Sequence, residues 1–180
     1  MTPFVALLRA VNVSGSNKIG MAELCKSCEA LGFTEVRSYL QSGNLVFRGD
    51  GAPGDVSAAL EARIVQDFGH AVEVLVMPGE EMAHVVSTNP LRPQGGKLGR
   101  LYHATFLFRH VSETRFAELD LPAQDGEKAV LVGRAVLLYC PQGYGKTRLN
   151  NAYFEKALGV PATTRNWRTV LKLRALSAAK

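Results

Sequence analysis

Residues 34–48 read Thr-Glu-Val-Arg-Ser-Tyr-Leu-Gln-Ser-Gly-Asn-Leu-Val-Phe-Arg. Two β-rich runs, 34–40 and 44–48, flank the polar triplet 41–43, in which Gly43 can adopt the positive φ that a tight turn requires. The pattern predicts a β-hairpin. The fold class follows from the segments on either side of this hairpin.

One strand and one helix are predicted on each side of the hairpin. Residues 4–11 are almost continuously apolar and too short for a helix, which favours a strand buried on both faces. A polar loop, 12–20, leads to a helix over 21–31 that Gly32 ends. Beyond the hairpin, apolar residues at helical spacing predict a second helix from Val56 to Phe68, and a strand follows over 72–77. The order is β-α-β-β-α-β.

The second half of the chain repeats this order after a connector rich in proline and glycine, 79–100, which holds a short helical stretch at 80–86. The expected elements are a strand at 101–108, a helix at 113–119, a hairpin over 129–140, a helix at 148–158, a very short strand at 163–164 and a helix from Asn166 to about 176. Two such units predict an α+β fold of two tandem ferredoxin-like domains, 1–78 and 101–180, with an extra C-terminal helix. We expect each domain to be an antiparallel sheet with two helices on one side.

Charge divides the chain of 180 residues unevenly. Residues 1–90 carry 6 Lys and Arg against 10 Asp and Glu, whereas residues 91–180 carry 15 against 6. A basic second half can attract phosphate-bearing partners, either small molecules or nucleic acid. The alternative is a solvated surface that only keeps the protein in solution.

The cysteines favour a reduced, cytoplasmic protein, because three is an odd number for a disulfide framework. Cys25 and Cys28 lie at helical spacing with apolar neighbours, so we interpret them as core residues. No histidine pair completes a zinc site, and we expect neither a metal nor a cofactor. The N-terminus lacks a basic segment, Arg9 interrupts its apolar run, and no stretch reaches the ~18–20 apolar residues of a membrane helix.

Several segments carry a family resemblance: Leu7 to Val13, Asn17-Lys18, Met21 to Leu24, Leu31 to Asn44, and Thr164 to Val170. With them the chain resembles the bacterial family known as domain of unknown function 1697, over nearly its whole length. The resemblance implies two tandem ferredoxin-like domains and no established activity. Ala10 and Ser14 stand where the family leads us to expect glycines, and Ser16 where the loop is commonly Gly or Lys, which stiffens the first loop.

The topology predicts a polar edge on the first domain. The first and second strands of such a sheet run the same way, so the loop after the first strand and the hairpin turn lie together. The start of the first helix, which favours anions, lies at the same edge. The residues expected there are Arg9, Asn12, Ser14, Asn17, Lys18, Gln41, Ser42 and Asn44. In the alternative reading they cap the helix and satisfy loop carbonyls, and Arg9 pairs with an acid such as Glu23 or Glu73.

Two further segments each allow a functional and a structural interpretation. Residues 140–147 end in the Gly-Lys-Thr of a phosphate-binding loop, but Cys140 replaces the first glycine of that motif. Simple anion contact by Lys146, Thr147 and Arg148 remains open. In residues 164–168, Arg165 and Asn166 either bind a ligand or begin a helix, with Trp167 as a packing anchor.

The leading hypothesis is a protein that binds a phosphate-bearing ligand: a nucleotide, an anionic metabolite or nucleic acid. One alternative is an enzyme with a site between the domains, lined by Arg9, Asn12, Lys18, Ser42, Asn44 and Arg165. Another is an interaction module. The sequence shows no ordered set of nucleophile, base and orienting residue, and it does not determine the oligomeric state.

Overall fold

The chain forms two compact units in a computed structural model that describes residues 1–178. Among the described residues, unit 1 contains 1–83 together with 173–178, and unit 2 contains 84–172. The domain boundaries inferred at residues 78 and 101 remain predictions. Two helices, α3 (Gly79–Ser87) and α7 (Trp167–Ser177), have residues in both units.

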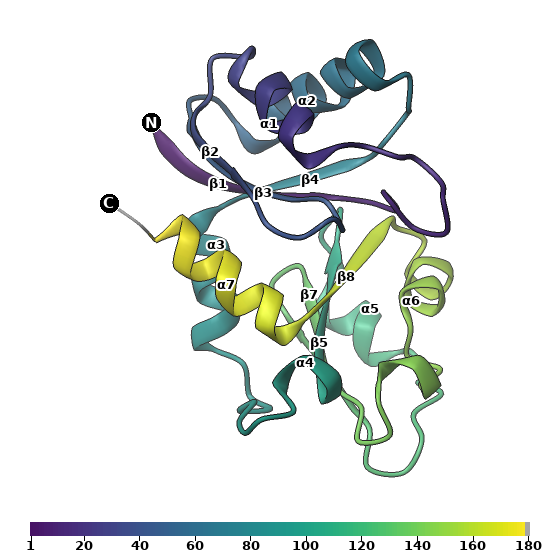
Figure 1. Cartoon of the computed structure of the whole chain (residues 1–180). Helices are drawn as coiled ribbons and strands as arrows, with labels where there is room; N and C mark the ends of the chain where they lie inside the picture. The colour runs from purple at the N-terminus through teal and green to yellow at the C-terminus, as the bar shows by residue number, and fades with distance from the viewer. Residues whose placement is uncertain (179–180) are drawn as a thin grey trace. The chain divides into compact units, whose positions relative to one another are not determined.

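Unit 1 has the predicted β-α-β-β-α-β order. Its elements are β1 (Thr2–Leu8), α1 (Met21–Glu29), β2 (Thr34–Ser38), β3 (Asn44–Gly49), α2 (Pro53–Phe68) and β4 (Val74–Pro78). The sheet order is β2-β3-β1-β4, and every neighbouring pair is antiparallel. The helices α1 and α2 cover one face of this sheet (Figure 1).

The core of unit 1 is apolar throughout. Phe4, Ala6 and Leu8 alternate along β1 and pack with Leu24 of α1 and Ile64 of α2. The intervening β1 side chains are buried as well. The prediction of a strand buried on both faces is therefore confirmed.

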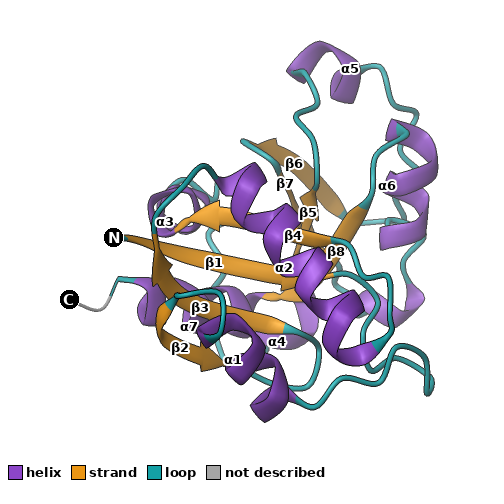
Figure 2. Ribbon diagram, turned by 90° about the horizontal axis from the view of Figure 1, so that it is seen from above, coloured by secondary structure: helices purple, strands orange, loops and turns teal. Residues whose placement is uncertain are grey.

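Unit 2 repeats the sheet. Its elements are α4 (Leu98–Leu101), β5 (Tyr102–Leu107), α5 (Glu113–Ala117), β6 (Lys128–Val132), β7 (Ala135–Tyr139), the 3₁₀ turn η1 (Tyr144–Lys146), α6 (Asn151–Leu158) and β8 (Ala162–Asn166). The antiparallel order β6-β7-β5-β8 matches that of unit 1 (Figure 2). Leu138 and Phe154 belong to its buried core, and Phe116 of α5 packs against that core. The two sheets confirm the predicted α+β architecture.

The last strand of unit 2 is longer than the sequence indicated. β8 pairs with β5 over five residues, from Ala162 opposite Leu107 to Asn166 opposite His103. The Asn166 side chain then accepts a hydrogen bond from the Thr169 backbone N–H at 3.0 Å, which confirms that Asn166 caps the final helix. Within residues 1–178, no helix has the length and apolar character needed to span a membrane.

Candidate functional site

Two loops of unit 1 meet at the edge that the topology predicted. The loop that follows β1 approaches the turn between β2 and β3, where the Leu8 backbone N–H donates to the Gly43 carbonyl at 2.9 Å. The side-chain amide of Asn12 donates to the Gln41 carbonyl at 2.8 Å. The meeting follows from the sheet order, because β1 and β2 both run antiparallel to β3, which lies between them.

Asn12 clamps this edge. Besides its bond to Gln41, its Nδ2 donates to the Ile19 carbonyl at 2.9 Å. Its Oδ1 accepts from the Ile19 backbone N–H at 2.8 Å. Both polar atoms of the side chain are thus engaged in fixing the loop just ahead of α1, which is the structural role that the alternative reading proposed.

Asn44 and Asn17 hold the same two loops. Asn44 is buried, and its Nδ2 donates to the Tyr39 carbonyl at 2.7 Å and to the Ser42 hydroxyl at 3.0 Å. Asn17 donates to the Ala10 carbonyl at 3.2 Å. The predicted asparagines therefore come together, and the hydrogen bonds described here connect them to loop backbone and to a loop hydroxyl, which is the geometry of residues that support loops.

Arg9 follows the end of β1 and pairs with one of the two acids named from the sequence. Its guanidinium lies 3.4 Å from the Glu73 carboxylate, and its backbone N–H donates to the Glu73 carbonyl at 3.0 Å. Since both side chains are partly exposed, the ion pair contributes little to stability. This pair is the one that the alternative reading of Arg9 described, with Glu73 rather than Glu23 as the partner.

The loop after β1 carries an unusual number of left-handed residues. The φ angles of Ala10, Asn12, Ser14 and Asn17 are 55°, 54°, 50° and 47°. For a residue with a Cβ such a conformation costs roughly 1–2 kcal/mol, and asparagine tolerates it best. The family resemblance leads us to expect glycine at positions 10 and 14, and these angles supply the physical reason. Backbone strain of this kind gathers at functional sites.

A hollow of about 490 Å³ opens beside this loop at the start of α1; we call it the α1 hollow. It is lined by Asn12, Gly15, Lys18, Ile19, Gly20 and Gln41. Gly20 occupies the N-cap of α1 and has no side chain with which to cap the helix. The one acid in the first turn, Glu23, lies 3.5 Å from the Lys26 ammonium. The positive end of the helix dipole and the exposed Lys18 therefore both favour an anion here.

Two exposed apolar side chains flank the same edge and were not singled out from the sequence. Val13 is 56% exposed and Leu40 is 52% exposed. Each is the chain neighbour of a residue in the Asn12–Gln41 bond, so they lie on adjoining loops. Leu40 also has a left-handed φ of 60°. In the sequence, Val13 and Leu40 each stand beside polar residues in a loop, and such an apolar residue in a polar loop is the signal that could have indicated them.

Arg165 and Asn166 belong to unit 2, on β8. Arg165 is buried, and its guanidinium donates to the Thr163 hydroxyl at 2.6 Å and the Thr164 carbonyl at 3.0 Å. Burial lowers the pKa of Arg165 to about 10. Trp167, directly after Asn166, is buried as the packing reading expected.

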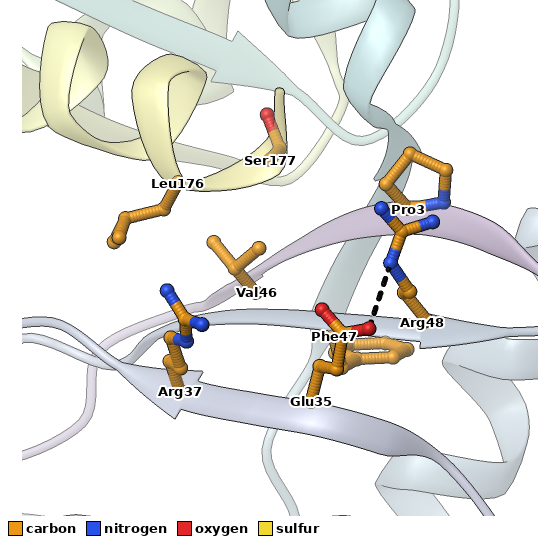
Figure 3. A pocket seen from close by; sticks show the side chains of 8 residues that line it. All are labelled: Pro3, Glu35, Arg37, Val46, Phe47, Arg48, Leu176 and Ser177. Atoms are coloured by element: carbon orange, nitrogen blue, oxygen red, sulfur yellow. Dashed lines mark ion pairs between the residues drawn. The ribbon is translucent and has the colours of Figure 1, made fainter. Parts of the chain in front are cut away.

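A second recess in unit 1 adjoins the last turn of α7 (Figure 3). Its lining includes Arg37, Leu176 and Ser177, and Arg48 there lies 3.3 Å from the Glu35 carboxylate. The cavity has a volume of about 10 Å³, which is about the space of one water molecule. This recess is too small for an organic ligand.

Two of the three thiols, those of Cys28 and Cys140, are buried, and burial disfavours the thiolate that metal binding and nucleophilic attack require. Burial, together with the nearby Cys25 thiol, raises the pKa of Cys28 to about 12. Burial raises the pKa of Cys140 to about 11. Across residues 1–178, no group of three or more His, Cys, Asp and Glu side chains is arranged to hold a metal ion.

The family model described as "Protein of unknown function (DUF1697)" matches residues 1–137. The chain belongs to this family. That result confirms the resemblance found in the sequence, and the family description assigns no activity. No curated protein matches the chain.

A solved structure supports the DUF1697 fold over the whole chain. The conserved bacterial protein SP0830 from Streptococcus pneumoniae is similar, with a TM-score of 0.67 and 24% sequence identity. The match covers 98% of each chain. At this level of identity the similarity shows a shared fold, and the function has to be argued from the site.

Proposed function

We propose that the protein binds a small phosphate-bearing ligand at the α1 hollow. The observation that carries this proposal is the hollow of about 490 Å³ at an uncapped helix start, with Lys18 on its wall. The backbone N–H groups of the first turn, the helix dipole and the ammonium all favour negative charge in the same place. The clamps made by Asn12 and Asn44 support the proposal by holding the two walls rigid before the ligand arrives.

A nucleotide fits this edge better than inorganic phosphate does. Val13 and Leu40 expose apolar surface on the two loops beside the hollow. A ligand that combines a flat apolar ring with a phosphate would cover that surface and also reach the start of α1. Inorganic phosphate would leave both side chains in water.

Two matched lysine variants test this proposal. Lys18→Ala removes the cation on the wall of the hollow, whereas Lys156→Ala removes an exposed lysine of α6 in unit 2. The affinity for AMP or ATP, measured by calorimetry, should fall about tenfold in Lys18→Ala because one charge-assisted contact is lost. Lys156→Ala should bind like the wild type. Equal affinity in all three proteins, or no binding at millimolar nucleotide, overturns the proposal.

Nucleic acid is the alternative phosphate-bearing ligand, and its binding is measured with the same three proteins. If the ligand of the α1 hollow is a small molecule, a labelled single-stranded oligonucleotide should bind there only with the weak, non-specific affinity expected of a basic surface. Micromolar binding that Lys18→Ala weakens, with an affinity whose logarithm falls steeply with the logarithm of the salt concentration, would instead identify nucleic acid as the ligand.

The proposed compartment is the cytoplasm, and the free state of Cys25, Cys28 and Cys140 supports it.

A further inference from the structure

Unit 2 carries a pair of tyrosines on the two central strands of its sheet. Tyr102 at the start of β5 lies opposite Tyr139 at the end of β7, with ring centroids 4.9 Å apart and an interplanar angle of 33°. Lys128 of β6 lies opposite Tyr139 on its other side. Residues that are directly opposite in antiparallel strands point to the same face, so the three side chains form a row across three strands. We call Tyr102, Tyr139 and Lys128 the tyrosine row.

The tyrosine row lies on the face of the sheet that points away from α6. Leu138, the residue before Tyr139, belongs to the same core as Phe154 of α6. Because successive side chains of a strand point to opposite faces, Tyr139 and its partners in the row point the other way. Both rings are partly exposed, and the lysine is exposed. Further along this face, Leu137 and Ala104 are buried, so its accessible part is the end that carries the tyrosines.

Unit 1 has no aromatic residue at the equivalent positions. The counterparts of the two tyrosines are Pro3 and Arg48, which lie opposite each other on β1 and β3. Thr34 stands where unit 2 has Lys128. Arg48 is paired with Glu35 at 3.3 Å. The same sheet therefore forms in unit 1 without an aromatic pair, so its architecture does not require the two tyrosines of unit 2.

Exposed cations lie at the start of β5, beside the tyrosine row. The short helix α4 leads directly into β5 (Figure 1), and it brings the exposed Lys97 and Arg100. Arg100 Nε lies 3.9 Å from the point that a Cβ on Gly143 would occupy, so the guanidinium reaches the turn that follows β7. Arg168 is exposed as well, and its guanidinium donates to the Gly96 carbonyl at 2.6 Å. Positive charge thus gathers around the end of the sheet where the tyrosines are accessible.

Accessible aromatic rings beside cations are the combination that a single-stranded nucleic acid requires. Four-stranded sheets that recognise RNA stack two or three bases on aromatic side chains. Every base has a face that can stack, but the base must be outside a duplex to use it. Residues 82–112, which include α4 and β5, contain no Asp or Glu that would repel a phosphate. The inference depends on these rings and charges, since a shared fold assigns no ligand.

We propose that the tyrosine row of unit 2 binds single-stranded RNA. One or two bases stack on the accessible parts of the Tyr102 and Tyr139 rings. Lys128, Arg100 and Lys97 contact the phosphates of the RNA backbone. The rings and cations are already accessible, so binding requires no rearrangement of the chain. This surface is distinct from the α1 hollow, which belongs to unit 1.

The first test replaces the tyrosines one at a time. Tyr102→Leu and Tyr139→Leu keep an apolar side chain for the sheet and remove the aromatic face, whereas Tyr139→Phe keeps that face. The probe is a labelled single-stranded RNA of about 12 nucleotides, long enough for several phosphate contacts, and its fluorescence anisotropy is measured. The wild type should bind it with micromolar affinity, and each leucine variant at least about fivefold more weakly. Tyr139→Phe should bind like the wild type, as should Tyr153→Leu, the control on α6.

The second test follows the charges and leaves the sheet unchanged. Arg100→Ala removes an exposed cation just before β5, and Arg109→Ala removes an exposed arginine shortly after the other end of that strand. The logarithm of the affinity for a single strand falls with the logarithm of salt concentration, with a slope of about −0.7 for each phosphate contact. Arg100→Ala should make this slope shallower by about 0.7, and Arg109→Ala should leave it unchanged. Equal slopes in all three proteins overturn the phosphate contacts.

The outcomes distinguish this surface from the α1 hollow. RNA that binds at the tyrosine row keeps its affinity in Lys18→Ala, and nucleotide binding at the hollow stays normal in Tyr139→Leu. RNA binding that is lost in Lys18→Ala but kept in both leucine variants overturns the tyrosine row and assigns nucleic acid to the hollow. An RNA duplex that binds as tightly as the single strand overturns base stacking. Absence of micromolar RNA binding at low salt overturns the proposal as a whole.

Discussion

Replacing Asn12 with alanine should destabilise unit 1. The change removes three hydrogen bonds, of 2.8, 2.8 and 2.9 Å, that tie the loop to Ile19 and to the Gln41 carbonyl. Since the site is partly exposed, each bond is worth the lower part of the usual range, about 0.5–1 kcal/mol. Alanine also fits the φ of 54° less well than asparagine, which adds about 1 kcal/mol. Asn12→Ala should therefore lower the free energy of unfolding by about 3 kcal/mol.

Two companion variants separate these contributions. Asn12→Gly loses the same bonds but accepts a left-handed backbone, so it should lie about 1 kcal/mol above Asn12→Ala in stability. Ser14→Ala changes a residue with a φ of 50° in the same loop and should have almost no effect. Asn12→Gly and Asn12→Ala lack the same side-chain hydrogen bonds and differ in their preference for the left-handed backbone, so the difference between them measures the backbone contribution alone.

The assay is urea unfolding followed by far-UV circular dichroism, with hydrogen exchange of residues 9–20 as a local probe. Trp167 lies in unit 2, and its fluorescence reports on that unit separately. The reasoning would be refuted if Asn12→Ala unfolded within about 0.5 kcal/mol of the wild type, a difference typical of inconsequential surface changes. A loss of nucleotide binding without loss of stability would then show Asn12 to be a contact residue rather than a clamp.

Three further predictions concern the backbone, a histidine and the thiols. Ala10→Gly and Ser14→Gly should each stabilise unit 1 by about 1 kcal/mol because glycine relieves their left-handed strain, and an unchanged urea midpoint would contradict that account. The pKa of His103 is about 4 in the folded chain, against 6.5 ordinarily. The unfolded chain therefore takes up the extra proton as pH falls from about 6.5 to 4, and stability decreases by up to about 1.4 kcal/mol per pH unit. His103→Phe should lack this contribution, which pH-dependent urea unfolding of the two proteins measures. A thiol-reactive disulfide reagent should modify Cys25 first and reach Cys28 and Cys140 only on unfolding, because burial raises the pKa of both; prompt modification of Cys28 in the native protein would count against this.

The sequence predicted the elements well and their ends less well. The apolar run 4–11 indicated a strand, and β1 ends at Leu8 because Ala10 turns left-handed, although Val11 is still buried. The helix expected from residue 148 begins at Asn151, since the Asn150 side chain caps it by accepting from the Tyr153 N–H at 2.9 Å. Hydrophobic periodicity indicates which face of an element is buried, whereas its ends depend on local hydrogen bonds that a pattern does not contain.

The sequence predicted which residues of the candidate site lie close together, but it did not show whether each of them supports a loop or contacts a ligand. Strand order alone brought Asn12 to Gln41, because parallel β1 and β2 end at one edge of the sheet. The sequence did not show that both polar atoms of the Asn12 side chain form hydrogen bonds to the backbone of Ile19 and Gln41. Asparagine caps and asparagine ligands look alike in a sequence, and they differ only in which donors and acceptors lie within about 3 Å.

By itself, the sequence determined the duplicated β-α-β-β-α-β order, the apolar cores, the hairpin at Gly43 and the family. These depend on local residue preferences and on the periodicity with which apolar groups must be buried. Only the tertiary structure decided which polar groups are satisfied. The buried Nδ1 of His103 and the buried Oε1 of Glu127 have no hydrogen-bond partner among residues 1–178. Whether such an atom is paired depends on groups brought from distant parts of the chain, and hydrogen bonds form or fail over tenths of an ångström.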